Sequence, residues 1–402
     1  MKVKPVILCG GSGTRLFPNF KKNPSKQFID FGGWTLFQKT LERVKSPIFD
    51  YPIISTNIEY KNLIINELKK QKIKNYKIIL EPVKKNTAPA FISSTLIDDI
   101  KINQPIIFLP SDHYIPDKNK FNKVLQKNVS YLTAKNIFLF GIKPKSPRSD
   151  YGYLSINHKD KSINKVIKFI EKPKKNKAIS IIKKGGLWNS GIVFARKDSI
   201  INNSKLLQKK LFNDCLLSLN KADQRKKIFT LNKTVFKKIT PISFDYAILE
   251  KANEINSIEL NTKWSDLGSW LEIFKVIKDK TNKNFILKNT FFRPWGSYKN
   301  YFKGKSFLIK ELTINKKSSI SLQKHHHRSE LWTVTNGKPK ITLGKKTFFK
   351  KINETIFVPK GTIHRIENLY KEPVKIVEAQ LGNILKETDI VRYQDIYGRV
   401  KN

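Results

Sequence analysis

A glycine-rich loop near the N-terminus holds the first residues whose types and spacing could do chemistry. The apolar run at residues 6–8 leads into Cys-Gly-Gly-Ser-Gly-Thr-Arg at residues 9–15. Glycines permit tight turns and positive φ, so successive backbone N–H groups can converge on an anion. Arg15 and Lys26 follow, and the cation of either side chain could meet phosphate oxygens. The spacing fits neither a Walker A loop nor a dinucleotide-binding fingerprint, and a loop of this kind, taken alone, is as often a plain turn as a ligand site.

The elements that must position this loop alternate between strands and helices over roughly the first 270 residues. Apolar runs at 105–109 and 137–140 are typical of buried strands, whereas apolar residues within 36–44 and 63–68 recur at helical spacing. Such alternation predicts a mostly parallel sheet with helices on both faces. Ligands are then expected at the carboxyl ends of the strands.

The pattern changes near residues 281–288. Short strand-like runs follow at 307–309, 332–334 and 376–377, and Gly and Pro residues interrupt them. This pattern predicts an all-β barrel or jelly roll. We therefore expect two domains, residues 1–283 and residues 284–402.

The composition excludes several classes of protein. A hydrophobic content of 39% with six Trp and 26 Phe is too high for a disordered chain. No run approaches the roughly 18 apolar residues of a membrane span, and the first residues predict a strand rather than a signal peptide. The two cysteines, Cys9 and Cys215, argue against a disulfide framework and against a cysteine-based zinc site. We expect a cytoplasmic protein without a membrane partner.

The net charge of +46 has two interpretations. One is a surface that attracts nucleic acid or anionic lipid. The other is a general bias toward lysine, since Lys, Ile and Asn are all abundant in the chain. The lysines are scattered through every segment, and no nucleic-acid-binding motif accompanies them. We therefore predict no specific nucleic-acid partner.

Seven further segments extend the motif at the N-terminus. Together with Pro-Ser-Lys-Gln-Phe at residues 24–28, the glycine loop resembles the opening of sugar-1-phosphate nucleotidylyltransferases. Residues 81–90, Glu-Pro-Val-Lys-Lys-Asn-Thr-Ala-Pro-Ala, are similar to a pattern of the mannose-1-phosphate guanylyltransferases. The remaining similar segments are 109–113, 171–173, 188–191, 264–270 and 243–251. We interpret only the last of these, residues 243–251, as scaffold near the site. Departures from the family's pattern stand at Phe17, Ser25, Lys84, Arg148 and Asp150.

The resemblance implies a reaction in which a sugar phosphate oxygen attacks the α-phosphorus of a nucleoside triphosphate and pyrophosphate leaves. Such a reaction needs positioning and charge neutralisation rather than a protein nucleophile. Mg²⁺ bridging the phosphates needs one or two carboxylates, and the implied pair is Asp112 and Asp266. A single aspartate at a strand end is more often a helix cap or a turn residue, so this assignment depends on the segments occurring together.

The resemblance also implies roles for the other residues. Arg15 and Lys26 would hold the triphosphate, and Lys172 would hold the sugar phosphate. The remaining implied contacts are Gly10, Gly11, Gly13, Thr14 and Glu81 to the nucleotide, and Gly152, Glu171 and Asn189 to the sugar hydroxyls.

The C-terminal part carries a second set of motifs. Arg-Pro-Trp-Gly at 293–296 resembles the start of the type II phosphomannose isomerase domain that is fused to guanylyltransferases, and residues 321–330 and 359–368 resemble the two cupin motifs. Residues two apart on a strand face the same way, so His325 and His327 could converge on one ion. Glu330 and His364 would complete a shell for a divalent transition metal, Zn²⁺ or similar. Arg392 is a candidate for binding the phosphate of an isomerase substrate.

Taken together, the residues and the resemblance predict a Rossmann-like α/β nucleotidyltransferase domain with a mixed sheet, followed by an all-β cupin jelly roll. The expected activity is bifunctional: GDP-mannose from GTP and mannose 1-phosphate, and interconversion of mannose 6-phosphate with fructose 6-phosphate. The expected partners are these substrates, with a homo-oligomer as a possibility. The alternatives are a cupin without activity, another sugar 1-phosphate as substrate, and a basic nucleic-acid-binding protein with a decayed enzyme fold.

Overall fold

The computed structural model describes residues 1–11, 16, 25–31, 34–157, 163–280, 289–394 and 396–397. These residues divide into two compact units. The first unit is made entirely of residues up to Asp266, and residues from Leu267 onward supply nearly all of the second. The expected domain boundary at residue 283 falls outside the described residues.

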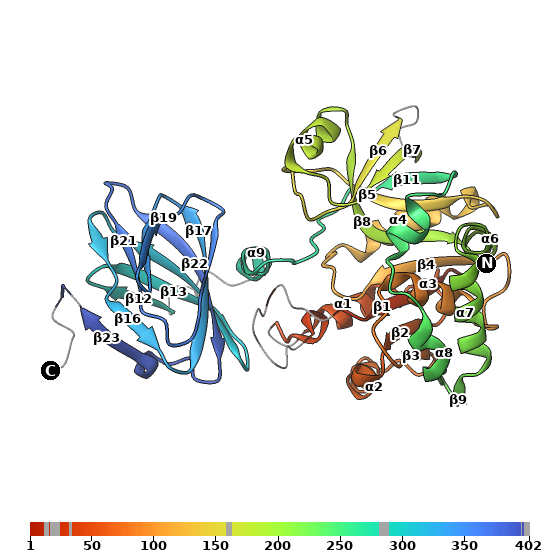
Figure 1. Ribbon diagram of the computed structural model, residues 1–402, viewed down its shortest axis with the longest axis horizontal. Coiled ribbons are helices and arrows are strands. Elements are labelled where there is room, and N and C mark those ends of the chain that lie inside the picture. Colours follow the sequence, from red (N-terminus) through yellow and green to blue (C-terminus); the bar gives the residue numbers. More distant parts are fainter. Residues whose placement is uncertain are drawn as a thin grey trace. The chain divides into compact units, whose positions relative to one another are not determined.

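The first unit is built on one mixed sheet (Figure 1). Its strands are β1 (Lys4–Cys9), β2 (Ile53–Asn57), β3 (Lys77–Glu81), β4 (Pro105–Pro110), β5 (Ile137–Ile142), β6 (Tyr153–Asn157), β7 (Ile163–Ile170), β8 (Leu187–Arg196), β9 (Asp223–Arg225), β10 (Ile228–Thr230) and β11 (Ile255–Glu259). They lie in the order β5-β11-β7-β6-β8-β4-β1-β2-β3-β10-β9. Neighbours from β4 to β10 pair in parallel, whereas β8 runs antiparallel to β4. This arrangement confirms the predicted mixed α/β sheet.

Helices cover both faces of this sheet. The helices are α1 (Leu36–Arg43), α2 (Lys61–Lys70), α3 (Thr87–Thr95), α4 (Lys118–Asn128), α5 (Lys175–Lys183), α6 (Lys197–Leu207), α7 (Lys209–Asn220) and α8 (Lys233–Lys238). Side chains alternate along β1, so Val6 packs in one core with α3 and α7, and Ile7 packs in the other with α1 and α2. The predicted helix at 36–44 begins at a capping box, in which Thr35 and Gln38 exchange hydrogen bonds of 3.0 and 3.1 Å.

The second unit consists of the helix α9 (Trp270–Lys280) and antiparallel strands, which confirms the predicted all-β C-terminal domain. The strands are β12 (Thr290–Arg293), β13 (Gly296–Lys303), β14 (Phe307–Ile314), β15 (Ser318–Ser319), β16 (Leu322–His325), β17 (Arg328–Asn336), β18 (Lys340–Leu343), β19 (Lys346–Phe349), β20 (Thr355–Val358), β21 (His364–Asn368), β22 (Val374–Gly382) and β23 (Ile390–Gln394). One sheet has the order β12-β13-β14-β22-β17-β20, and the other has the order β19-β18-β21-β16-β23, with β15 on β21. Trp332, Ile341, Ile366 and Ile376 belong to the core shared by the two sheets.

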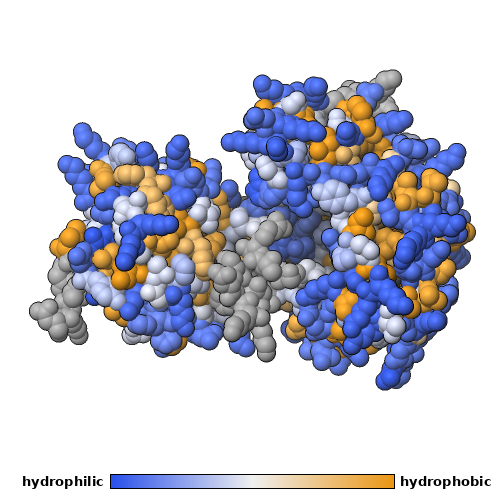
Figure 2. All heavy atoms as spheres, in the orientation of Figure 1, coloured by the Kyte–Doolittle hydropathy of each residue, from blue (hydrophilic) through white to orange (hydrophobic). Residues whose placement is uncertain are grey.

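Hydrophilic residues cover most of the face drawn in Figure 2, and hydrophobic residues are interspersed among them. This distribution agrees with the scattering of lysines along the sequence. Within the described ranges, none of the helices has the length and apolar character needed to cross a membrane.

Candidate active sites

Lys26 joins the two segments of the first unit that carry the expected carboxylates. It lies in the short helix η1 (Lys26–Phe28). Its Nζ is 2.7 Å from Oδ2 of Asp112 and also donates a hydrogen bond to the backbone carbonyl of Asp266. Backbone hydrogen bonds of 2.9 and 3.1 Å between Tyr114 and Ser265 hold the two segments side by side. Three residues that are far apart in the sequence thus meet at the carboxyl end of β4.

The two carboxylates have different surroundings. The side chain of Asp112 is 30% exposed. Burial alone would raise its pKa, but the nearby charges of Lys26 and His113 hold that pKa at about 2. Asp266 is buried, and its Oδ1 accepts a hydrogen bond of 2.7 Å from the hydroxyl of Tyr151. Oxygen donors of this kind, with substrate phosphates as further ligands, fit Mg²⁺.

Part of the expected phosphate loop can be placed. Gly10 and Gly11 follow directly after β1, at the carboxyl edge of the sheet. Gln27, next to Lys26, donates from Nε2 to the carbonyl of Gly11 at 3.4 Å. Gly13, Thr14 and Arg15 lie outside the described residues.

The residues expected to contact the sugar lie beside one another. The backbone N–H of Asn189 donates to the carbonyl of Gly152 at 2.8 Å. A Cβ at Gly152 would lie only 2.7 Å from Oε2 of Glu171, so glycine lets that carboxylate lie directly over the backbone. Lys172 pairs with Glu171 at 2.9 Å, and its backbone has a φ of 45°, which is unusual for a lysine.

Asp245 also belongs to this group, although the sequence analysis treats its segment only as scaffold. Nδ2 of Asn189 donates to Oδ1 of Asp245 at 3.4 Å. Burial and the negative charge of Glu171 raise the pKa of Asp245 to about 6. Tyr151 was missed in the same way. Tyr151 directly precedes Gly152, which was the available signal for it, whereas no comparable local signal singled out the carboxylate of Asp245.

Glu81 ends β3 and is buried. The hydroxyl of Ser55 donates to Oε1 of Glu81 at 3.0 Å. Ile79, two residues earlier on the strand, packs in the core with α3 and α7, so the carboxyl of Glu81 is on that face. Burial raises its pKa to about 7. Its contact with a nucleotide stays a prediction.

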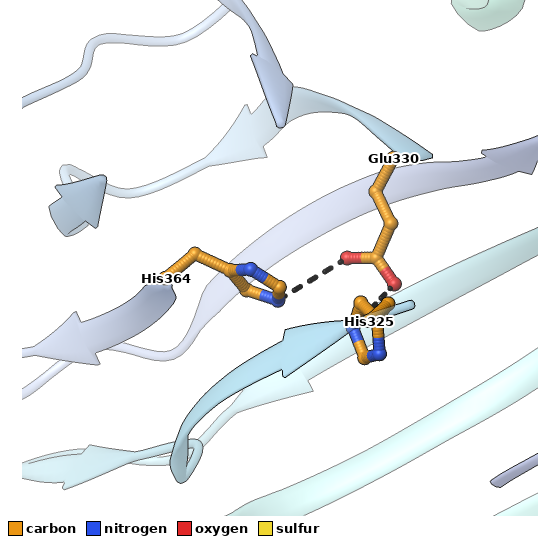
Figure 3. A group of neighbouring side chains, drawn as sticks. All are labelled: His325, Glu330 and His364. Carbon is orange, nitrogen blue, oxygen red and sulfur yellow. Dashed lines mark ion pairs between the residues drawn. The ribbon is translucent and has the colours of Figure 1, made fainter. Parts of the chain in front are cut away.

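Three buried residues of the second unit form a group that suits a metal ion. Nε2 of His325 lies 3.0 Å from Oε1 of Glu330, and Nε2 of His364 lies 3.7 Å from Oε2 (Figure 3). The ligand atoms all lie within 4.8 Å of one another. Two imidazoles and a carboxylate form a donor set that Zn²⁺ and similar divalent metals accept.

Neighbouring groups orient these ligands. Nδ1 of His364 lies 2.8 Å from the carbonyl of Thr362, and Nδ1 of His325 lies 3.3 Å from the carbonyl of Asp389. With a proton on each Nδ1, the lone pairs of the two Nε2 atoms are directed toward the carboxylate of Glu330. A cation held between the two imidazoles and this carboxylate would remove the repulsion between the lone pairs and the carboxylate oxygens. Arg328 donates from Nε to Glu330 at 3.0 Å, which fixes the carboxylate.

His327 does not join this group, contrary to the expected strand alternation. β16 ends at His325 and β17 begins at Arg328, so the period of two is interrupted between them. The side chain of His327 is 53% exposed and pairs through Nδ1 with Asp389 at 2.8 Å. Gln323 was missed, although it precedes His325 by two residues on β16. Its Nε2 lies 3.5 Å from Nε2 of both His325 and His364.

The metal-ligand group opens onto a cavity of the second unit. The lining includes Glu330 and Glu378 together with the cations Arg293, Lys310, Arg328 and Arg392. Glu378 is buried, and its pKa is raised to about 7 by burial and by the charge of Glu330. Arg392, the expected phosphate ligand, therefore shares one cavity with Glu330. Its cation and those around it suit an anionic substrate.

Both units resemble known proteins. Residues 4–283 match the nucleotidyl transferase family, and residues 280–395 match the mannose-6-phosphate isomerase C-terminal family. The alginate biosynthesis protein AlgA of Pseudomonas fluorescens is 29% identical, over 98% of this chain and 96% of that protein. The mannose-1-phosphate guanylyltransferase of Salmonella montevideo is 28% identical, over 99% of this chain and all of that protein (100%).

Solved structures agree with these matches. A mannose-6-phosphate isomerase from Helicobacter pylori aligns with a TM-score of 0.58 and 26% identity, over 66% of this chain and 100% of that one. A Thermus thermophilus protein described as a mannose-1-phosphate geranyltransferase aligns with a TM-score of 0.59 and 23% identity, over 69% of this chain and 79% of that one, and shows a shared fold. With its mixed sheet and its antiparallel C-terminal sheets, the chain belongs to the nucleotidyl transferase family and carries a C-terminal domain of the mannose-6-phosphate isomerase family.

Proposed function

We propose that the first domain transfers GMP from GTP to mannose 1-phosphate, and that the second domain interconverts mannose 6-phosphate and fructose 6-phosphate. The meeting of Lys26, Asp112 and Asp266 carries the first part of this proposal. The buried group of His325, Glu330 and His364 beside a cationic cavity carries the second. Relatives named as mannose-1-phosphate guanylyltransferases align over nearly their whole length, which supports the choice of substrate.

In the transferase domain, Lys26 neutralises phosphate charge and keeps Asp112 ionised before substrate arrives. Mg²⁺, when held by Asp112 and Asp266, supplies further charge neutralisation at the phosphates. Tyr151 orients Asp266 through its hydroxyl. Arg15 supplies a second cation to the triphosphate. The other proposed nucleotide contacts are Gly10, Gly11, Gly13, Thr14 and Glu81.

On the sugar side, Glu171 and Asn189 bind hydroxyls beside Gly152, and Lys172 binds the sugar phosphate. Lys172 is 59% exposed in its side chain, so it can turn from Glu171 to an incoming phosphate without leaving a core position. This arrangement aligns the attacking phosphate oxygen by fixing both ends of the sugar phosphate. Positioning of this kind accounts for a large part of the rate enhancement in phosphoryl-group transfer.

In the isomerase domain, His325, Glu330 and His364 would hold a divalent transition metal such as Zn²⁺, which stabilises negative charge on the sugar oxygens when bound. Arg328 and Trp332 hold the carboxylate of Glu330, with hydrogen bonds of 3.0 and 3.1 Å. Arg392 binds the phosphate and so fixes the distance of the sugar from Glu330. The two family matches support residues 1–283 and 284–402 as the domains, although α9 clusters with the strands of the second unit. The cytoplasm is the proposed location, which suits the two free, buried cysteines.

The full chain tests both activities in one experiment. We would incubate it with each of the four nucleoside triphosphates and several sugar 1-phosphates, with and without Mg²⁺, and separate the nucleotide sugars by chromatography. GDP-mannose should be the main product and should require Mg²⁺. A parallel assay with mannose 6-phosphate and added Zn²⁺, Co²⁺ or Mn²⁺ should give fructose 6-phosphate. Absence of isomerisation with every metal would leave a guanylyltransferase with a non-catalytic cupin domain.

A further inference from the structure

Asp245 occupies a rigid position at the edge of the proposed sugar site. It is the first residue of the π-helical turn η4 (Asp245–Leu249), an element that is frequent at functional sites. The preceding residue, Phe244, stacks on Phe91 with ring centroids 4.1 Å apart, and its N–H donates to Oγ1 of Thr87 at 2.8 Å. The backbone before Asp245 is therefore anchored in the core, while its own side chain reaches Asn189.

The contact with Asn189 has a defined direction. Oδ1 of Asn189 accepts a hydrogen bond of 3.1 Å from the N–H of Gly191, so the Nδ2 group is the one that faces Asp245. The carboxylate of Asp245 thus lies next to a residue expected to bind sugar hydroxyls. One amide hydrogen bond satisfies only a part of the acceptor capacity of a carboxylate, which has about four lone-pair sites.

The charges around Asp245 favour a ligand that donates hydrogen bonds. Two carboxylates, Asp245 and Glu171, act on each other, and the ammonium of Lys172 pairs with Glu171 at 2.9 Å. If Lys172 turns to a substrate phosphate, the repulsion between Glu171 and Asp245 is no longer reduced by that cation. Sugar hydroxyls are donors that would relieve this repulsion, and two carboxylates can each accept from one of two neighbouring hydroxyls.

We propose that Asp245 is a sugar-binding residue that, beside Asn189, accepts a hydrogen bond from a hydroxyl of the sugar 1-phosphate and so contributes to the choice of sugar. This inference rests on the proposed transferase function and adds a specificity-determining residue to its site. Asn189 holds the carboxylate in place and links it to Gly152.

Steady-state kinetics of the full chain test the proposal. Asp245→Asn should raise the KM for mannose 1-phosphate about tenfold, because a hydrogen bond to a charged group is lost, while the KM for GTP changes less than about twofold. Asp245→Ser, which retains a small acceptor for Asn189, should behave in the same way. Glu250→Gln is the matched control, because Glu250 is an exposed acid at the end of the same turn and should leave both KM values unchanged.

A series of deoxy analogues of mannose 1-phosphate identifies the hydroxyl. The analogue that lacks the hydroxyl bound by Asp245 should bind more weakly to the wild type and should lose nothing further in Asp245→Asn. The proposal would be overturned if the loss from Asp245→Asn and the loss from the missing hydroxyl multiplied for every analogue. It would also be overturned if Asp245→Asn left the KM for mannose 1-phosphate unchanged, or raised the KM values for mannose 1-phosphate and GTP equally. If the wild type makes no GDP-mannose, the proposed function fails instead. In that case, the Kd for mannose 1-phosphate, measured by calorimetry, tests whether Asp245 binds the sugar. An equal Kd in wild type and Asp245→Asn would refute this role.

Discussion

The ammonium of Lys26 lies 2.7 Å from the carboxylate of Asp112, and the side chains are 5% and 30% exposed. One partner is the proposed phosphate-binding cation and the other is the proposed magnesium ligand. Their pairing keeps Asp112 ionised in the free protein, since the charge of Lys26 holds the pKa of that carboxyl at about 2 against the effect of burial. In a metal-bound triphosphate, the phosphates are negative and suit Lys26, whereas Mg²⁺ is positive and suits Asp112. The substrate can therefore replace the ion pair without leaving either charge unpaired.

Removal of either carboxylate should therefore abolish most of the transferase activity. We expect Asp112→Asn and Asp266→Asn each to lower kcat by roughly two orders of magnitude or more, because an amide oxygen is a poor substitute for a carboxylate at Mg²⁺. Circular dichroism should remain unchanged. Tyr151→Phe, which removes only the hydrogen bond to Asp266, should have a smaller effect. Near-normal turnover of both aspartate variants at limiting Mg²⁺ would contradict the two-carboxylate assignment.

The sequence allows a residue to be placed in the fold when one contiguous motif contains both that residue and the end of a strand. Asp112 follows the end of β4 after one residue, and the apolar pattern that predicts β4 is local, so its position at the carboxyl edge could be expected. Asp245 could not be found in this way. Its link to Asn189 joins residues 56 positions apart, and only the folded chain brings them together.

The position of His327 could not be predicted from the sequence for a different reason. The alternation rule holds only while a strand continues, and three consecutive histidines give no sign that β16 ends at the first of them. The same rule, applied backwards along β16, would have pointed to Gln323 instead. Glu330 was expected at the metal site because residues 321–330 resemble a cupin motif, and it lies inside the regular strand β17.

Glu81 should make the stability of the first unit depend on pH. Its folded-state pKa of about 7 exceeds the value of about 4.3 in an unfolded chain, so the folded state binds the proton more tightly. Stability is therefore lost as the pH rises from about 4.3 to about 7. Compared with wild type, Glu81→Gln should be nearly neutral at pH 4 and stabilising by up to about 3 kcal/mol at pH 8.

Urea unfolding of wild type and Glu81→Gln at several pH values measures this difference. Glu59→Gln serves as a control of opposite sign, because pairing with Lys84 at 2.6 Å lowers the pKa of the half-exposed Glu59. Parallel pH profiles for wild type and Glu81→Gln would show that Glu81 is not a buried, proton-binding carboxyl.

The isomerase should distinguish two histidines of the two metal motifs, His327 and His364. His364→Ala removes a buried metal ligand, so we expect loss of mannose 6-phosphate isomerisation and of the metal bound to the second unit. His327→Ala removes an exposed side chain that pairs with Asp389, and should retain metal and most activity. Metal content by mass spectrometry and the isomerase assay together check this, with GDP-mannose synthesis as the control that both variants should pass. Equal loss of metal in the two variants would show that His327 is a metal ligand after all.

Lys317 offers a test of backbone strain in the second unit. Its φ is 50°, in the left-handed region that costs an ordinary residue roughly 1–2 kcal/mol but costs glycine little. Lys317→Gly relieves this strain, although glycine also increases the entropy of the unfolded chain. We expect a net stabilisation of about 0.5–1 kcal/mol, seen as a rise of a few degrees in the Tm of the transition that responds to added Zn²⁺. Lys316→Gly is the matched control. It changes the neighbouring exposed lysine, whose φ is not in the left-handed region, so it should lower the same Tm. A decrease of equal size in both variants would show that the left-handed backbone at Lys317 imposes no cost.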